Sequence, residues 1–104
     1  MSVVVDLADL PARLQDFDRG YLLTTAEGLV KAVSVRAASG DGTLLVATPG
    51  GGSLRNVAAN PSVTLLFPPL ESPGMSLLVD GTAAAEGDDV RVTPTGAVLH
   101  RPVA

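Results

Sequence analysis

The chain has 104 residues, 46% of them hydrophobic and 17% charged, with no cysteine and a formal net charge of −4. A chain of this length has room for one core, so we expect a single domain over residues 1–104. The lack of cysteine excludes disulfides and thiolate metal sites, and the acidic balance with only three aromatic residues argues against a nucleic-acid interface.

The first predicted element is an amphipathic helix between Asp6 and Asp18. Its apolar residues recur at helical spacing: Leu7, Leu10, Leu14 and Phe17. Asp6 and Asp9 are both candidate N-caps, and the helix is expected to end near Gly20.

Three short runs rich in leucine and β-branched residues follow and predict a three-stranded antiparallel meander: 21–25, 29–36 and 43–48. The turn sequences Glu27-Gly28 and Ser39-Gly40-Asp41-Gly42 separate these runs. Val33 and Val35 alternate with small or polar residues, as in a strand with one buried face.

A short second helix is predicted over residues 53–59. Pro49 and a run of three glycines interrupt the strands before it, and Asn60-Pro61 is expected to end it. Ser53 is the natural candidate for its N-cap.

Strands resume at 63–67, 76–85 and 90–93, with 97–100 as a candidate last strand. The run from Val63 to Phe67 is apolar on both faces, so we expect it inside a barrel or beneath a partner subunit. Six to seven antiparallel strands, one N-terminal helix and one short helix predict a mainly β fold, a small and partly closed barrel.

The sequence also suggests a compartment. No apolar stretch approaches the roughly 18 residues that a transmembrane helix needs. No basic segment precedes the run Val3-Val4-Val5, as it would in a signal peptide. We therefore expect a cytoplasmic protein that does not enter a membrane.

Few residues are suited to catalysis by themselves. His100 is the only histidine, so a protein-bound catalytic metal is not expected. The Gly-x-Ser-x-Gly elbow and the lysine-bearing phosphate loop are both absent. Asp88 and Asp89 are adjacent and are interpreted as a solvated turn. Any redox chemistry would therefore come from a bound cofactor.

The segment from Pro49 to Asn56 is the strongest candidate for a binding site. Its glycines allow successive backbone N–H groups to converge on an anion, and the following helix adds unpaired donors, although a merely flexible connection has the same composition. Residues 28–70 carry a net charge of +2 within the acidic chain. Arg55 either reaches such an anion or is simply solvated. Lys31 and Arg36 would lie on opposite faces of a regular strand unless a bulge intervenes.

Several segments share their order with a known family: GYLLTT, VKAVSVR, TLLVAT, a glycine-serine turn, a short helix ending in Ala-Asn-Pro, SVTLLFP and SLLVDGTAAAEG. The most specific piece is Asn60-Pro61 followed by the apolar strand. In this order they resemble the pyridoxamine 5'-phosphate oxidase-like family, the flavin-binding split barrels. The resemblance covers most of the chain.

The resemblance implies a homodimer that holds FMN in clefts between its subunits and acts as a small flavin-dependent oxidoreductase. It places Lys31 and Arg36 where two basic residues contact the flavin phosphate. The residues between them would offer backbone groups to the isoalloxazine ring: Ala32, Val33, Ser34 and Val35. Thr48, Ser53 and Arg55 complete the expected cofactor-binding set. Some relatives use the deazaflavin coenzyme, and others bind haem. For haem, His100 is the candidate axial ligand.

The chain departs from the family in the phosphate turn. Flavin enzymes of the family carry Ser-Arg-Lys ahead of the short helix, where this chain has Gly51-Gly52-Ser53. Two cationic ligands are thus missing, each worth about 1.5–3 kcal/mol as a charged hydrogen bond. Only three residues separate Glu86 from Val90, where larger members insert a helix. Both departures favour the alternative, a cofactor-free dimeric barrel with a structural or regulatory role.

Overall fold

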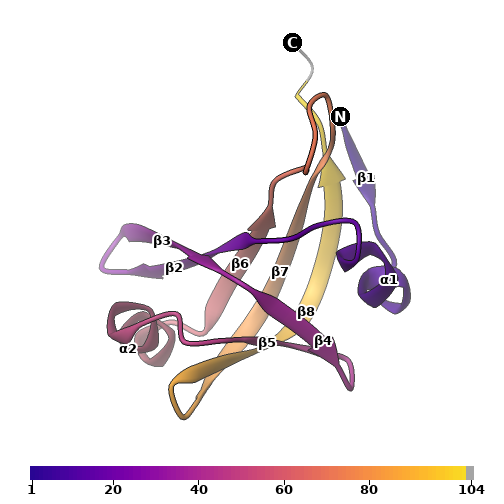
Figure 1. Ribbon diagram of the computed structural model, residues 1–104. Helices are drawn as coiled ribbons and strands as arrows, with labels where there is room; N and C mark the ends of the chain where they lie inside the picture. Colours follow the sequence, from indigo (N-terminus) through magenta and orange to yellow (C-terminus); the bar gives the residue numbers. More distant parts are fainter. Residues whose placement is uncertain (103–104) are drawn as a thin grey trace.

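The structure, a computed structural model, describes residues 1–102. Within them, eight antiparallel strands form one curled sheet, with two helices beside it (Figure 1). The elements in chain order are β1 (Ser2–Val4), a 3-10 turn (Leu7–Asp9), α1 (Leu10–Leu14), β2 (Gly20–Ala26), β3 (Leu29–Val35), β4 (Ala37–Gly40), β5 (Thr43–Val46), α2 (Gly51–Ala59), β6 (Ser62–Phe67), β7 (Ser76–Glu86) and β8 (Asp89–His100). The expected mainly β split barrel is confirmed.

One continuous segment, residues 29–40, links the two ends of the sheet. The strand order of the sheet is β3-β2-β6-β7-β8-β5-β4, with β1 paired to β8. β3 and β4 stand at opposite ends of this order, yet Arg36 alone joins them in the chain. In Figure 1 the segment runs diagonally across the open side of the sheet. The barrel is therefore split at this segment.

The expected three-stranded meander is wrong in its third strand. β2 and β3 do form a hairpin, but β5 pairs with β4 and β8, not with β3. The reason lies at Ser39-Gly40, which belongs to β4 and leaves Asp41-Gly42 as the turn. Both hairpin turns have positive φ at their two residues, 53° and 77° at Glu27-Gly28 and 53° and 78° at Asp41-Gly42. Such turns match the twist of paired strands.

The N-terminal helix is shorter than its hydrophobic spacing predicts. Asp6 caps the 3-10 turn, because its Oδ1 accepts a hydrogen bond from the Ala8 N–H at 3.0 Å. After α1, residues 15–17 continue as turns with hydrogen bonds from residue i+3 to residue i, which ends the regular helix early. Leu10 is buried in the core, whereas Leu7 remains 39% exposed.

The second half of the chain forms the centre of the sheet. β6 lies between β2 and β7, so the expectation that it is inside the barrel is confirmed. The two short strands expected over 90–93 and 97–100 are one strand, β8, which pairs along the whole of β7. Thr95 is the extra residue of a bulge opposite Asp80 and Gly81. No helix of the described residues is long and apolar enough to cross a bilayer.

The second helix starts earlier than expected. α2 begins at Gly51, and its N-cap is Gly50 with φ of 100° and no side-chain cap. The prediction that Ser53 caps this helix is therefore wrong, because the chain already reverses at Gly50. Ser53 lies inside the first turn, where it is fully buried. The helix ends at Asn60-Pro61, as predicted.

Candidate functional site

Two asparagines hold α2 against β2. Asn56 Nδ2 donates to Thr24 Oγ1 at 3.1 Å, and Asn60 Nδ2 donates to Thr25 Oγ1 at 2.7 Å. Thr24 is fully buried, and its partner across the β2–β3 hairpin is Lys31. The same contacts that fix α2 therefore bring its first turn beside Lys31.

The side chain of Lys31 extends over this first turn. A Cβ atom at Gly52 would lie 2.8 Å from Lys31 Cε, which is closer than real Cβ atoms come to a neighbour, and 3.0 Å from its Nζ. Arg55 reaches back along the helix, so that its Nη1 would lie 3.3 Å from a Cβ atom at Gly51. The two glycines thus leave room for two cationic side chains.

Neither of these cations has an acidic partner in the part of the chain that the structure describes. The ion pairs found there join other residues: Arg13 with Asp16, Arg36 with Asp18, and Arg91 with Glu86. The first turn of α2 adds N–H groups that have no acceptor within the helix, and the positive end of its dipole. Positive charge therefore gathers at the start of α2 with no compensation from residues 1–102.

The hydroxyl of Ser53 is a second unsatisfied group in the same turn. Ser53 is fully buried, and its Oγ has no hydrogen-bond partner among the described residues. Leaving a buried polar group unpaired costs about 1–3 kcal/mol. A ligand oxygen or a water at this turn would satisfy it.

The loop before α2 also carries a predicted site residue, Thr48. Thr48 is exposed, and its N–H donates to Asp89 Oδ1 at 2.9 Å. Because that N–H is already engaged, the side-chain hydroxyl is the hydrogen-bond donor that Thr48 can still offer a ligand.

Arg36 lies apart from the first turn of α2. The β2–β3 pairing is regular over the whole of β3, so no bulge brings Arg36 to the face of Lys31. Arg36 follows β3 and pairs with Asp18, and both side chains are more than half exposed. Five residues of extended chain correspond to about 16 Å. Lys31, Ser53 and Arg55 are brought together, whereas Arg36 is not.

β3 itself is the last strand at its end of the sheet. Its outer backbone groups therefore have no strand partner within residues 1–102. Val33 and Val35 turn toward the core, while Ala32 and Ser34 are exposed on the other face. The Ser34 hydroxyl accepts a hydrogen bond from Arg19 Nε at 3.0 Å. The contact of residues 32–35 with a flavin ring stays a prediction.

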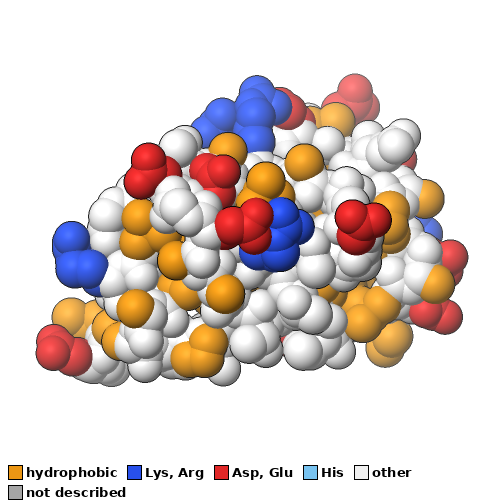
Figure 2. Space-filling model, turned by 90° about the horizontal axis from the view of Figure 1, so that it is seen from below, with side chains coloured by type: hydrophobic (Ala, Val, Ile, Leu, Met, Phe, Trp, Pro, Cys, Tyr) orange, Lys and Arg blue, Asp and Glu red, His pale blue; other side chains and the backbone are white. Residues whose placement is uncertain are grey.

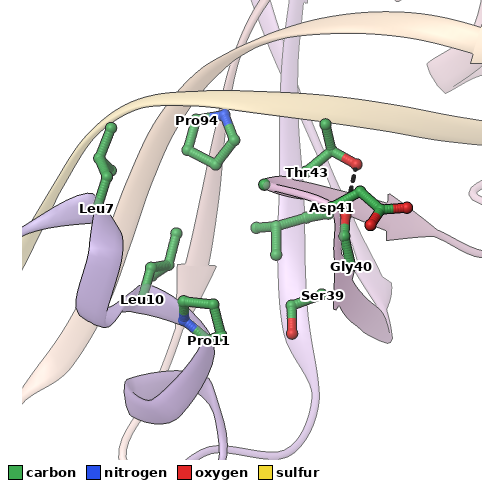
Figure 3. A pocket seen from close by; sticks show the side chains of 10 residues that line it. Leu7, Leu10, Pro11, Ser39, Gly40, Asp41, Thr43 and Pro94 are labelled. Carbon is green, nitrogen blue, oxygen red and sulfur yellow. Dashed lines mark hydrogen bonds between the residues drawn. The ribbon is translucent and has the colours of Figure 1, made fainter.

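A cavity of about 340 Å³ lies between the N-terminal turn and the β4–β5 hairpin (Figure 3), and none of its lining residues belongs to α2. Leu7, Leu10 and Pro11 form one wall, and the Asp41 carboxylate points away from them (Figure 3). No lysine or arginine lines this cavity. It therefore offers no cationic ligand for a phosphate.

The remaining charged and metal-ligating groups of residues 1–102 do not gather at a further site. On the face seen in Figure 2, basic side chains occur in small groups beside acidic and hydrophobic ones, not as a continuous basic surface. His100 is exposed, with its Nδ1 3.2 Å from Ser2 Oγ. Among residues 1–102, no group of three or more histidine and acidic side chains could hold a metal ion.

A curated relative shows the family of this chain. An uncharacterized protein of Mycobacterium tuberculosis is 39% identical over 117 aligned positions, which cover 96% of this chain and 82% of the relative. The chain belongs to the same family as this mycobacterial protein. No family model matches the sequence.

Solved structures show its fold. A Listeria innocua protein described as a candidate pyridoxamine 5'-phosphate oxidase matches with a TM-score of 0.74 at 18% identity, covering 89% of this chain and 96% of that one. An FAD binding protein from Mycobacterium smegmatis matches with a TM-score of 0.71 at 22% identity, covering 96% and 98%. The fold is the split barrel of the pyridoxamine 5'-phosphate oxidase-like proteins, which confirms the resemblance found in the sequence.

Proposed function

We propose that this split barrel binds a flavin nucleotide through a phosphate held at the start of α2. The observation that carries the proposal is the pair of cations without acidic partners, Lys31 and Arg55, packed against the first turn of that helix. The Mycobacterium smegmatis protein with the same fold is an FAD binding protein, which supports a flavin as the ligand.

The residues of this turn fit a phosphate. Helix N–H groups and two cations suit its negative charge. The Ser53 hydroxyl is buried and unpartnered in the same turn, so it can donate to a phosphate oxygen only where that oxygen replaces an atom that now covers it. Lys31 reaches the turn from β3, and Arg55 reaches it from one helical turn further on. These two side chains replace the basic pair that is missing at Gly51-Gly52.

The edge of β3 is the proposed place for the flavin ring. Its outer backbone groups have no strand partner within residues 1–102 and can donate to or accept from a flat heterocycle. When bound, the flavin supplies electron or hydride transfer, as expected of a small oxidoreductase. The chain contributes the phosphate ligands and the apolar surroundings that exclude water.

We also propose that a second copy of the chain covers this edge. Tyr21 and Val30 lie on one face of the β2–β3 hairpin, 42% and 66% exposed, with Leu23 and Ala32 between them, and Leu29 at the turn is 73% exposed. Exposed apolar patches of this kind mark interfaces. We expect sedimentation to show a dimer and Val30→Asp to shift it toward monomer. A monomeric wild type at micromolar concentration would contradict the dimer.

The cofactor is tested by direct titration. Purified protein is examined for flavin absorbance and then titrated, after removal of any bound cofactor, with FMN, FAD and the deazaflavin coenzyme. We expect saturable quenching of flavin fluorescence, and an affinity about tenfold weaker for Lys31→Ala. Arg13→Ala, which removes a cation paired with Asp16, is the matched control and should bind like wild type. Absence of binding to any flavin would favour the cofactor-free alternative.

A further inference from the structure

The loop that leads into α2 has a backbone conformation that needs support. Thr48 has φ of 35°, in the left-handed region that β-branched residues rarely occupy. Gly50 has φ of 100°, and Pro49 between them is buried. The chain therefore turns sharply at Thr48 just before the helix begins.

A carboxylate from a distant hairpin supports this turn. Asp89 is the first residue of β8, and its Oδ1 accepts the hydrogen bond from the Thr48 N–H at 2.9 Å. Asp89 is half-buried and takes part in no ion pair of the described chain. Asp89 is thus not part of a solvated turn, whereas the adjacent Asp88 is exposed and makes no side-chain hydrogen bond within residues 1–102.

The hydrogen bond between Thr48 and Asp89 lies close in the chain to the proposed anion site at the start of α2. Only Pro49 and Gly50 separate Thr48 from the first residue of α2, Gly51. Glycine backbones rotate more freely than any others, so residues 50–52 restrain the start of α2 less than other residue types would. The hydrogen bond at Thr48 restrains the segment that aims the first N–H groups of α2.

We propose that Asp89 is a positioning residue for the flavin phosphate site, acting through the Thr48 N–H. This inference rests on the proposed function. Asp89 does not touch the phosphate and carries the same sign of charge. If its charge alone mattered, removing it would tighten the binding of an anion, whereas loss of positioning weakens it.

Three variants separate these effects. Asp89→Ala removes the acceptor, and Asp89→Asn keeps an acceptor oxygen without the charge. Asp88→Ala removes a neighbouring charge that makes no side-chain hydrogen bond within residues 1–102. We expect Asp89→Ala to bind FMN about fivefold to tenfold more weakly than wild type. Asp89→Asn and Asp88→Ala should stay within about twofold. Equal affinity of Asp89→Ala and wild type, or tighter binding by Asp89→Ala, would overturn the proposal.

Amide hydrogen exchange of the ligand-free protein provides a readout independent of flavin. In Asp89→Ala we expect faster exchange at Thr48 and at residues 50–53, with unchanged exchange in β6 at the centre of the sheet. Unchanged exchange at 48–53, or faster exchange throughout the barrel, would overturn a positioning role. A wild type that binds no flavin would contradict the proposed function, and the exchange pattern would still decide whether Asp89 holds the turn.

Discussion

Lys31 and Arg36 are five residues apart, yet their surroundings differ in kind. Arg36 pairs with Asp18 at the surface, and such an exposed pair contributes about 0–1 kcal/mol. Lys31 packs over Gly52, the Arg55 guanidinium reaches back to the same turn, and neither has an acidic partner within residues 1–102. A surface cation that already pairs with an acid gives no reason to expect a ligand. Two cations gathered at a helix start without an acid support the proposal that an anion from outside the described chain binds there.

The largest expected effect comes from removing both cations of the α2 turn. Lys31→Ala with Arg55→Ala should weaken FMN binding by about two orders of magnitude, because two charged hydrogen bonds are lost. Isothermal titration calorimetry measures this change. A double variant within about threefold of wild type would show that the phosphate lies elsewhere.

Gly52→Ala should separate binding from stability. The new Cβ atom would lie 2.8 Å from Lys31 Cε and displace the end of that flexible side chain, so FMN affinity should fall by about fivefold. The midpoint of thermal unfolding should stay equal or rise, because alanine favours a helix over glycine by about 0.5–1 kcal/mol. Gly51→Ala, where Arg55 Nη1 lies at 3.3 Å, is the milder control. A Gly52→Ala variant with lower stability and unchanged affinity would contradict this packing.

Arg36→Ala tests directly whether Arg36, unlike Lys31, lies outside the phosphate site. Since Arg36 is engaged with Asp18, we expect its removal to change FMN affinity by less than about twofold. The family resemblance taken alone predicts a loss as large as that of Lys31→Ala. A loss of that size, measured in the same titration, would show that the phosphate contacts both residues.

The smallest effect concerns Glu86 and Arg91 at the end of the β7–β8 hairpin. The hydrogen bonds from the Arg91 guanidinium lower the pKa of the Glu86 carboxyl from its ordinary 4.5. A lowered folded pKa means that the pair stabilises the protein above pH 4.5 and loses this effect as the pH falls through the folded value. The difference in unfolding midpoint between wild type and Glu86→Gln should therefore be small at pH 7 and vanish in acid. A difference that grows on acidification would contradict this sign.

Local signals in the sequence predicted much of the fold. Glu27-Gly28 and Asp41-Gly42 marked their turns because glycine, and aspartate at position 41, suit the positive φ that these turns need. The pairing of β5 with β8, and the short strand β1, were missed because they depend on partners far away in the chain. The start of α2 was missed because a glycine φ of 100° replaces the usual side-chain cap.

The sequence allowed us to name residues of the candidate site, but not to predict how they are arranged. Lys31, Ser53 and Arg55 each followed from residue type and the family pattern. Their meeting depends on the β2–β3 register and on Asn56, which ties α2 to Thr24. Asp89 gave no signal, because nothing in the sequence connects it with Thr48 across 41 positions. Contacts of this range follow only from the folded barrel.

The most direct test compares FMN with riboflavin, which has the same ring and no phosphate. Both are titrated into wild type and Lys31→Ala. We expect wild type to bind FMN at least about tenfold more tightly than riboflavin, and Lys31→Ala to lose most of that difference. Equal affinities for the two ligands in wild type, or a preference for FMN that survives in Lys31→Ala, would contradict a phosphate site at the start of α2.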